Sequence, residues 1–291
     1  MNDIDRAFNF LPYLRDVPAF AALGDAPARF IAGGSQLRTA TRGQIICEKG
    51  SHASGFQCLL DGRIKLAALS PLGAERVLDI LQPGRVFGVA AVLLDEPYPV
   101  FAESICESRV LVVGRERIHT AIAEWPEVAA VMLKLVAGDV HRLIHDLEAC
   151  CLMTARQRLT DFLIKQGRCS CASGDRAVVV LPAAKALIAS NLNISAETFS
   201  RELHELAHRG LVAIERRTIL IPSVDRLAAF VFDDPIAEPG ARQRGERSGL
   251  TSPSIGLRTD PGVARDAGDG YNRRSTGRKQ ADRRALGIDA S

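Results

Sequence analysis

The chain has 291 residues, of which 47% are hydrophobic and 24% are charged, and its formal net charge is +3. This length exceeds one average domain, so we expect two folded units and some additional chain. The near-neutral balance does not by itself indicate a nucleic-acid-binding protein, and any such site must depend on cations at particular positions.

The N-terminal residues 1–14 mix Asp and Arg with apolar residues and lack the basic start and apolar run of a signal peptide. No stretch approaches the roughly eighteen consecutive apolar residues of a membrane-spanning helix. We therefore expect a cytoplasmic protein without a membrane partner. The seven cysteines are odd in number and form no paired CxxC framework, which favours free buried thiols. Cys169 and Cys171, which are two residues apart in an expected polar loop, are the pair that leaves a redox or metal alternative open, and we predict no metal site.

Short apolar stretches separated by glycines run from about residue 37 to residue 113. Such stretches, about ten residues apart, are typical of strands in a small antiparallel barrel or roll. The expected strands include residues 58–60, 64–66, 77–80 and 110–113.

A long amphipathic helix follows, with Pro126 near its first turn. Its apolar residues recur at steps of three and four and form one narrow seam, which favours a coiled-coil homodimer. The alternative is that the seam packs on the chain's own roll. The seam consists of Met132, Val136, Val140, Leu143, Leu147 and Cys150.

A second amphipathic helix at residues 154–167 and a strand at residues 177–181 precede a helix-turn-helix pattern. Residues 184–189 form the expected first helix and residues 191–194 the turn. Ser195 is a preferred N-cap for a second helix that extends to about His208. Gly210 is suited to the left-handed stop. Residues 211–215 and 218–221 then form a hairpin that turns at Arg216 and Arg217, where a wing contacts phosphates.

The segment from Leu181 to Val212 closely resembles the DNA-binding domain of the CRP/FNR family. The resemblance rests on Leu181-Pro182, Lys185 and the runs 192–195, 197–203 and 209–212. It extends over residues 15–232, because the roll and the long helix also match the family. It implies an α+β fold with an N-terminal cyclic-nucleotide-binding-like β-roll, a long dimerisation helix and a C-terminal winged helix-turn-helix. The implied function is a transcriptional regulator, an activator or a repressor, that binds double-stranded DNA as a homodimer and contacts RNA polymerase.

Within this resemblance, Glu197, Ser200 and Arg201 match the FNR-type Glu-x-x-Ser-Arg pattern. The pattern implies that Arg201 contacts guanine, that Glu197 accepts from cytosine and that Ser200 lies near a thymine of a palindromic TTGAT-like site. The first two pairings also follow from the chemistry of the major groove. The residues expected to contact phosphates are Lys185, Ser195, Thr198, Arg216 and Arg217.

The roll lacks the residues with which the family binds cyclic AMP. In the aligned segment Val89 replaces the glutamate of Gly-Glu-Leu, and residues 99–101 replace the later Arg-Ser-Ala. A cyclic phosphate would therefore have no charge-assisted partner. No cysteine precedes Cys47, which also argues against an FNR-type iron-sulfur cluster. The DNA-binding half resembles DNR/NnrR-type regulators, which implies nitric oxide sensed through haem, with His141 and His145 as candidate ligands.

These features predict four segments: a helical lead and β-roll sensor at 1–117, a dimerisation helix at 118–150, a winged helix-turn-helix at 151–232 and a disordered tail at 233–291. The basic excess lies in the tail, because eleven Lys and Arg accompany seven Asp and Glu from residue 237 onward. One alternative is a sensor protein that regulates a partner protein without touching DNA. A haem or thiol redox enzyme is the other, but no nucleophile-base constellation or phosphate loop supports catalysis, so we predict a protein that is not an enzyme.

Overall fold

The computed structural model describes residues 10–170 and 175–233, and all of them belong to one compact unit. The predictions for residues 1–9, for Cys171 and for the tail from residue 234 lie outside the described residues. Within the described ranges, no helix has both the length and the apolar character needed to cross a bilayer.

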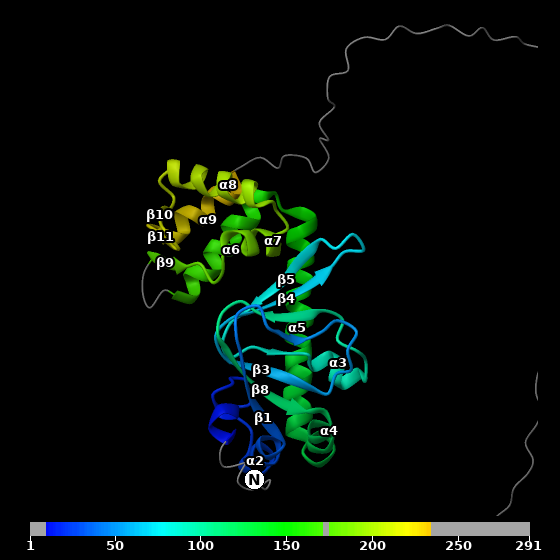
Figure 1. Ribbon diagram of the computed structural model, residues 1–291. Coiled ribbons are helices and arrows are strands. Elements are labelled where there is room, and N and C mark those ends of the chain that lie inside the picture. The colour runs from blue at the N-terminus through cyan, green and yellow to red at the C-terminus, as the bar shows by residue number, and fades with distance from the viewer. Residues whose placement is uncertain (1–9, 171–174, 234–291) are drawn as a thin grey trace, which may run out of the picture. The chain divides into compact units, whose positions relative to one another are not determined.

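The N-terminal half contains the predicted antiparallel roll, built from two four-stranded sheets (Figure 1). The strand order is β1-β8-β3-β6 in one sheet and β2-β7-β4-β5 in the other. The strands are β1 (Ser35–Ala40), β2 (Ile45–Cys47), β3 (Gly55–Asp61), β4 (Ile64–Leu69), β5 (Glu75–Leu81), β6 (Val86–Phe87), β7 (Phe101–Ser104) and β8 (Ser108–Gly114).

The roll encloses one apolar core, to which short helices also contribute. Phe20 and Phe56 stack inside it with ring centroids 5.9 Å apart, and Leu59, Ile64 and Leu111 are fully buried. Along β8, Val110, Leu111 and Val113 are buried and Arg109 is exposed, so this strand lies largely inside the roll. The surrounding helices are residues 10–15, α2 (Asp25–Gly33), α3 (Val89–Leu94) and α4 (Arg115–Glu124).

The long helix α5 (Pro126–Leu152) begins at the proline that the sequence indicated. The single helix expected at 118–150 is wrong at its start, because residues 118–124 belong to the separate helix α4. Trp125 between them is extended, with φ −127° and ψ 105°. The physical reason is Pro126, which disfavours helical backbone at the preceding residue and supplies no N–H donor.

The predicted seam of α5 divides into two parts. Met132 is buried in the roll core, as the alternative of packing on the chain's own roll requires. Farther along, Val140, Leu143 and Leu147 leave 50%, 61% and 63% of their surface exposed. Leu133, which is 71% exposed and lies seven residues before Val140, continues this exposed stripe in place of Met132.

The C-terminal half is a winged helix-turn-helix with its own apolar core. A three-stranded antiparallel sheet of order β10-β11-β9 packs with four helices around the buried residues Leu159, Phe199, Leu203, Ile219 and Leu227. The elements are α6 (Ala155–Ser170), β9 (Ala177–Val180), α7 (Lys185–Asn191), α8 (Ala196–His208), β10 (Ala213–Glu215), β11 (Thr218–Ile221) and α9 (Val224–Asp233).

Candidate nucleic-acid interface

The turn between α7 and α8 is closed by local hydrogen bonds. Asn193 has a left-handed backbone with φ +58°, a conformation that Asn adopts more readily than most residues. The next residue, Ile194, donates its N–H to the carbonyl of Ala189 at 3.0 Å. Ser195 then caps α8, because its Oγ accepts from the backbone N of Thr198 at 3.0 Å. The predicted start of the second helix is confirmed, including its cap.

One face of α8 is anchored in the domain core. Phe199, Leu203 and Leu206 are fully buried, in agreement with the predicted inward face. Between them, the Glu202 carboxylate is 11% exposed and accepts from Nε of Arg156 on α6 at 2.8 Å. A buried carboxylate needs such a partner, so this ion pair fixes the rotation of α8 relative to α6.

The opposite face of α8 presents Glu197, Ser200 and Arg201. These positions are three and four residues apart on a continuous helix, so their side chains share a face. Glu197 is exposed, Ser200 is half-buried, and the Arg201 side chain is 68% exposed. Arg201 reaches Glu202 at 3.3 Å, a weak contact that leaves most of its donors free for another acceptor. The structure thus brings an acid, a hydroxyl and a guanidinium together on the exposed side of one helix.

The hydroxyl groups of Ser195 and Thr198, at the start of α8, differ in whether their hydrogen is free to donate. Ser195 Oγ accepts from the Thr198 backbone and donates to Thr198 Oγ1 at 2.9 Å, so its hydrogen is already used. Thr198 keeps its own hydroxyl hydrogen, which can donate to an external acceptor. Of the two, Thr198 is therefore the better placed to donate to a phosphate, while Ser195 holds the helix end.

The predicted wing is present as the hairpin of β10 and β11, and its tip is cationic. Arg216 at the tip has φ +56°, and Arg217 donates to the carbonyl of Leu181 at 3.2 Å. Gly210, with φ +67°, occupies the left-handed position directly after the C-cap of α8 and turns the chain toward the hairpin. Lys185 is the first residue of α7 and is half-buried. Arg216 and Arg217 are exposed, so cations flank the helix-turn-helix.

Inside the roll, apolar and uncharged side chains surround Gly88, in the segment that aligns with the cyclic-AMP-binding residues of the resembled family. Val89 is buried at the position where the resemblance places a glutamate. A Cβ on Gly88, which has φ +81°, would meet the Tyr98 ring at 3.0 Å and Gln57 Oε1 at 3.1 Å. Tyr98 donates to the carbonyl of Gly55 and accepts from Gln57 Nε2 at 3.1 Å. Burial raises the pKa of Tyr98, so its phenol stays neutral.

The histidine pair proposed as haem ligands does not fit such a site in this chain. His141 and His145 lie on the surface of α5 with ring centroids 5.0 Å apart. His145 leaves 55% of its side chain exposed and lies 3.7 Å from a carboxylate oxygen of Glu148. A haem site encloses the macrocycle in an apolar pocket, which an exposed helix face does not provide. Across the described residues, no three or more His, Cys, Asp or Glu side chains gather into a metal-binding group.

The sequence reasoning missed Glu202 as a residue that supports the site. Glu202 lies beside the buried Phe199 and Leu203, so its charge is placed at the edge of the domain core. The helical period could have indicated this position, because residue 202 is three residues after 199 and four before 206 and therefore shares their buried face. Its partner Arg156 lies 46 residues earlier, so the pair itself could not be read from local spacing.

Two domain models match separate parts of the chain. A model described as a cyclic nucleotide-binding domain matches residues 37–124, which is the roll with α4. A model described as a Crp-like helix-turn-helix domain matches residues 157–230, which is the C-terminal domain. The two matches occur in the order in which the fold places these domains.

Known proteins match a longer part of the chain than either domain model does. The chain is 26% identical over 188 residues to the CRP-like cAMP-activated global transcriptional regulator of Mycobacterium tuberculosis, an alignment covering 64% of this chain and 84% of the relative. It is 23% identical over 193 residues to the fumarate and nitrate reduction regulatory protein of Salmonella typhimurium, covering 65% and 76%. The structure of FixK2 from Bradyrhizobium japonicum shares the fold, with a TM-score of 0.61 and 22% identity over 67% of this chain and 96% of that one.

Proposed function

Because the chain joins a cyclic-nucleotide-binding roll to a Crp-like helix-turn-helix, it is a transcriptional regulator of the CRP/FNR family, and we propose that it reads a palindromic TTGAT-like DNA site as a homodimer. The observation that carries this proposal is that Glu197, Ser200 and Arg201 share the outer face of a helix whose inner face is anchored in the domain core. Regulators of this type act on transcription by contacting RNA polymerase, which we propose as the second macromolecular partner.

The base contacts follow from the chemistry of the trio. An arginine in the major groove donates two hydrogen bonds to guanine O6 and N7, and a carboxylate accepts from cytosine N4. Arg201 has the free donors for the first contact and Glu197 the free acceptor for the second, with Ser200 beside them for a neighbouring thymine. Lys185, Thr198, Arg216 and Arg217 then hold the phosphates, and Ser195 serves mainly as the cap. With Glu197, Ser200 and Arg201 as base contacts, the proposed reading helix is of the DNR/NnrR-like form.

The homodimer is supported by the exposed stripe of α5. Leu133, Val140 and Leu147 recur every seven residues, and Leu143 lies between the last two at a spacing of three and four. All four expose apolar surface that a single chain does not cover. Two parallel copies bury this stripe against each other as a coiled coil. The dimer also supplies the two-fold symmetry that a palindromic site requires, with the reading helices one DNA turn apart.

A charge placed on the stripe tests the homodimer. We expect Leu143→Glu to shift the protein from dimer to monomer in sedimentation, because the introduced carboxylates would face each other in the interface. His145→Glu introduces the same charge at an exposed position off the stripe and should stay dimeric. Equal sedimentation of both variants as dimers would place the interface elsewhere.

The effector differs from that of the cAMP-activated relative named above. The buried Val89 stands where cyclic-AMP binders carry a glutamate, and the Tyr98–Gln57 pair fills the space beside Gly88, so we propose that the roll does not respond to cyclic AMP. Nitric oxide sensing of the DNR/NnrR type would require His141 and His145 as haem ligands. Both histidines are exposed in the single chain, which does not support this effector. An absorption spectrum of the purified dimer with and without nitric oxide tests it, and the absence of a haem band would remove it while leaving the DNA proposal intact.

A gel shift decides between this function and a sensor that acts on a partner protein. The purified full chain is titrated into a duplex containing TTGAT-N4-ATCAA and into a matched duplex with the same composition in shuffled order. We expect saturable binding with at least about tenfold preference for the palindrome, since each mismatched base pair typically costs about 1 to 3 kcal/mol. Equal, salt-sensitive binding to both duplexes, or none to either, would favour the partner-protein alternative.

A further inference from the structure

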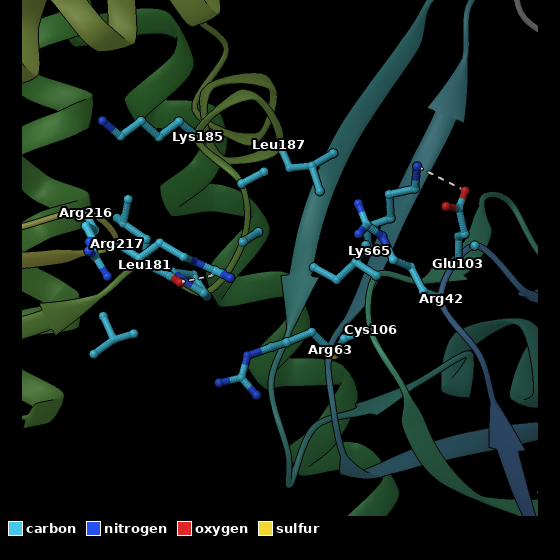
Figure 2. Close-up of a pocket in the computed structure, with 16 residues that line it drawn as sticks. Arg42, Arg63, Lys65, Glu103, Cys106, Leu181, Lys185, Leu187, Arg216 and Arg217 are labelled. Carbon is cyan, nitrogen blue, oxygen red and sulfur yellow. Dashed lines mark hydrogen bonds and ion pairs between the residues drawn. The ribbon is translucent and has the colours of Figure 1, made fainter.

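A cationic cleft of about 900 Å³ lies between the roll and the winged helix-turn-helix, inside the compact unit (Figure 2). Figure 2 shows basic side chains on both of its walls. The roll contributes Arg42, Arg63 and Lys65, and the C-terminal domain contributes Lys185, Arg216 and Arg217.

Most of this positive charge is not neutralised by the protein. Lys65 is paired with Glu75 at 2.8 Å and with Glu103 at 3.0 Å. Among the described residues, the other five cations of the cleft form no ion pair with a carboxylate. Arg63 shows the deficit most clearly: one of its terminal nitrogens donates to the carbonyl of Gly62 at 2.7 Å, while its Nε is buried and has no acceptor. A buried donor without an acceptor is uncommon in folded proteins.

The two basic walls are nevertheless held close together. Beside the cleft, the backbone N of Val77 donates to Ser190 Oγ at 3.0 Å, and Asn191 Nδ2 donates to the carbonyl of Leu78 at 2.9 Å. These bonds join β5 to α7 and keep like charges facing each other. Such an arrangement becomes favourable when an anion with several negative oxygens lies between the walls.

We propose that this cleft binds a small polyphosphate anion, of the class of pyrophosphate, triphosphate or the phosphate chain of a nucleotide. Arg63 and Arg42 hold it from the roll, and Lys185, Arg216 and Arg217 hold it from the winged domain. Guanidinium groups match this ligand because each presents several donors in one plane to phosphate oxygens. The site is separate from the Gly88 region of the roll.

The inference goes beyond the proposed function and is linked to it through shared residues. Lys185, Arg216 and Arg217 are also the proposed contacts to DNA phosphates, so an anion in the cleft competes with the DNA backbone for them. By linkage, each ligand then weakens the other by the same factor. The polyphosphate would act as a negative effector that ties the winged domain to the roll.

Direct titration tests the site without using DNA. Inorganic triphosphate is titrated calorimetrically into the full chain at constant ionic strength, with sulfate as the comparison anion. We expect one saturable site per chain, and at least tenfold weaker binding by Arg42→Ala/Arg63→Ala. The matched control is Arg38→Ala, an exposed arginine of β1 outside the cleft lining. Equal binding by the wild type and the double variant, or no saturable binding, overturns the proposal, provided that thermal unfolding shows all three proteins folded.

A second arm separates a free anion from the DNA backbone as the occupant. Anisotropy with the palindromic duplex is measured with and without triphosphate. We expect triphosphate to weaken DNA binding by the wild type and much less by the double variant, whose affinity without triphosphate should match the wild type. If the double variant binds DNA more weakly with no triphosphate present, Arg42 and Arg63 serve the DNA backbone, and the small-anion site is refuted. A failure of all proteins to bind the palindrome affects the proposed function but leaves the calorimetric result standing.

Discussion

Replacing Arg201 by alanine separates base reading from general attraction to DNA. The side chain is 68% exposed, and its ion pair with Glu202 is long, at 3.3 Å, so the free energy of unfolding should change little. In the complex, the substitution removes a bidentate contact to guanine worth about 1 to 3 kcal/mol. That loss corresponds to roughly a 5- to 150-fold higher Kd for the matched palindrome. On a duplex already mutated at the guanine, the same variant should lose almost nothing.

Lys185→Ala provides the contrast in the same assay. A phosphate contact carries no sequence information, so this variant should bind all duplexes more weakly by a similar factor, and the slope of log Kd against log salt should fall by about 1. Anisotropy titrations on the matched and mutated duplexes at several salt concentrations measure both effects. If Arg201→Ala loses the same factor on both duplexes, Arg201 is a phosphate contact and the assignment of the reading face is wrong.

Three further predictions use other parts of the described structure. Ser195→Ala should lower the free energy of unfolding, measured with urea, by about 1 kcal/mol, because it removes the N-cap of α8. Ser195→Asp should restore the stability, since Asp is also a good N-cap. An alanine variant as stable as the wild type would contradict the capping role. Burial raises the pKa of Cys47 to about 11, so an alkylating reagent at pH 8 should spare Cys47 in the native protein and label the exposed Cys150 and Cys151. Labelling of Cys47 should increase as the pH approaches 11. Labelling of Cys47 as fast as Cys150 at pH 8 would contradict its burial. In the parallel dimer Cys150 continues the α5 stripe, so a copper–phenanthroline oxidant should join two chains through a disulfide and give a dimer band on a non-reducing gel. Cys150→Ser should remove this dimer band and Cys151→Ser should keep it. A dimer band that persists in Cys150→Ser would exclude this register.

Local patterns were sufficient for the winged domain because its signals lie close together in sequence. Ser195 as a cap, Gly210 as a stop and the buried positions Phe199 and Leu203 each depend on neighbours within a few residues. The three proposed reading residues follow for the same reason, since a helix places residues 197, 200 and 201 on one face whatever else surrounds it.

The seam of α5 shows where periodicity alone was insufficient. Met132 and Leu133 both fit an apolar repeat that continues to Val140, and only packing distinguishes them, because the roll covers Met132 and leaves Leu133 exposed. The separation of α4 from α5 was missed at the domain level for a different reason. Apolar residues continue through this region, while the break depends on one proline and the extended backbone before it.

The amino-acid sequence by itself determined the order of the elements, the two-part domain organisation and the composition of the proposed reading face, since these depend on contacts between residues near in the chain. Only the tertiary structure decided that Arg156 neutralises Glu202 behind that face, that Tyr98 and Gln57 fill the space beside Gly88, and that Arg63 faces the cations of the winged domain. Each of these pairs joins residues 41 or more positions apart. Folding brings such residues together through the packing of whole elements, which no local spacing encodes.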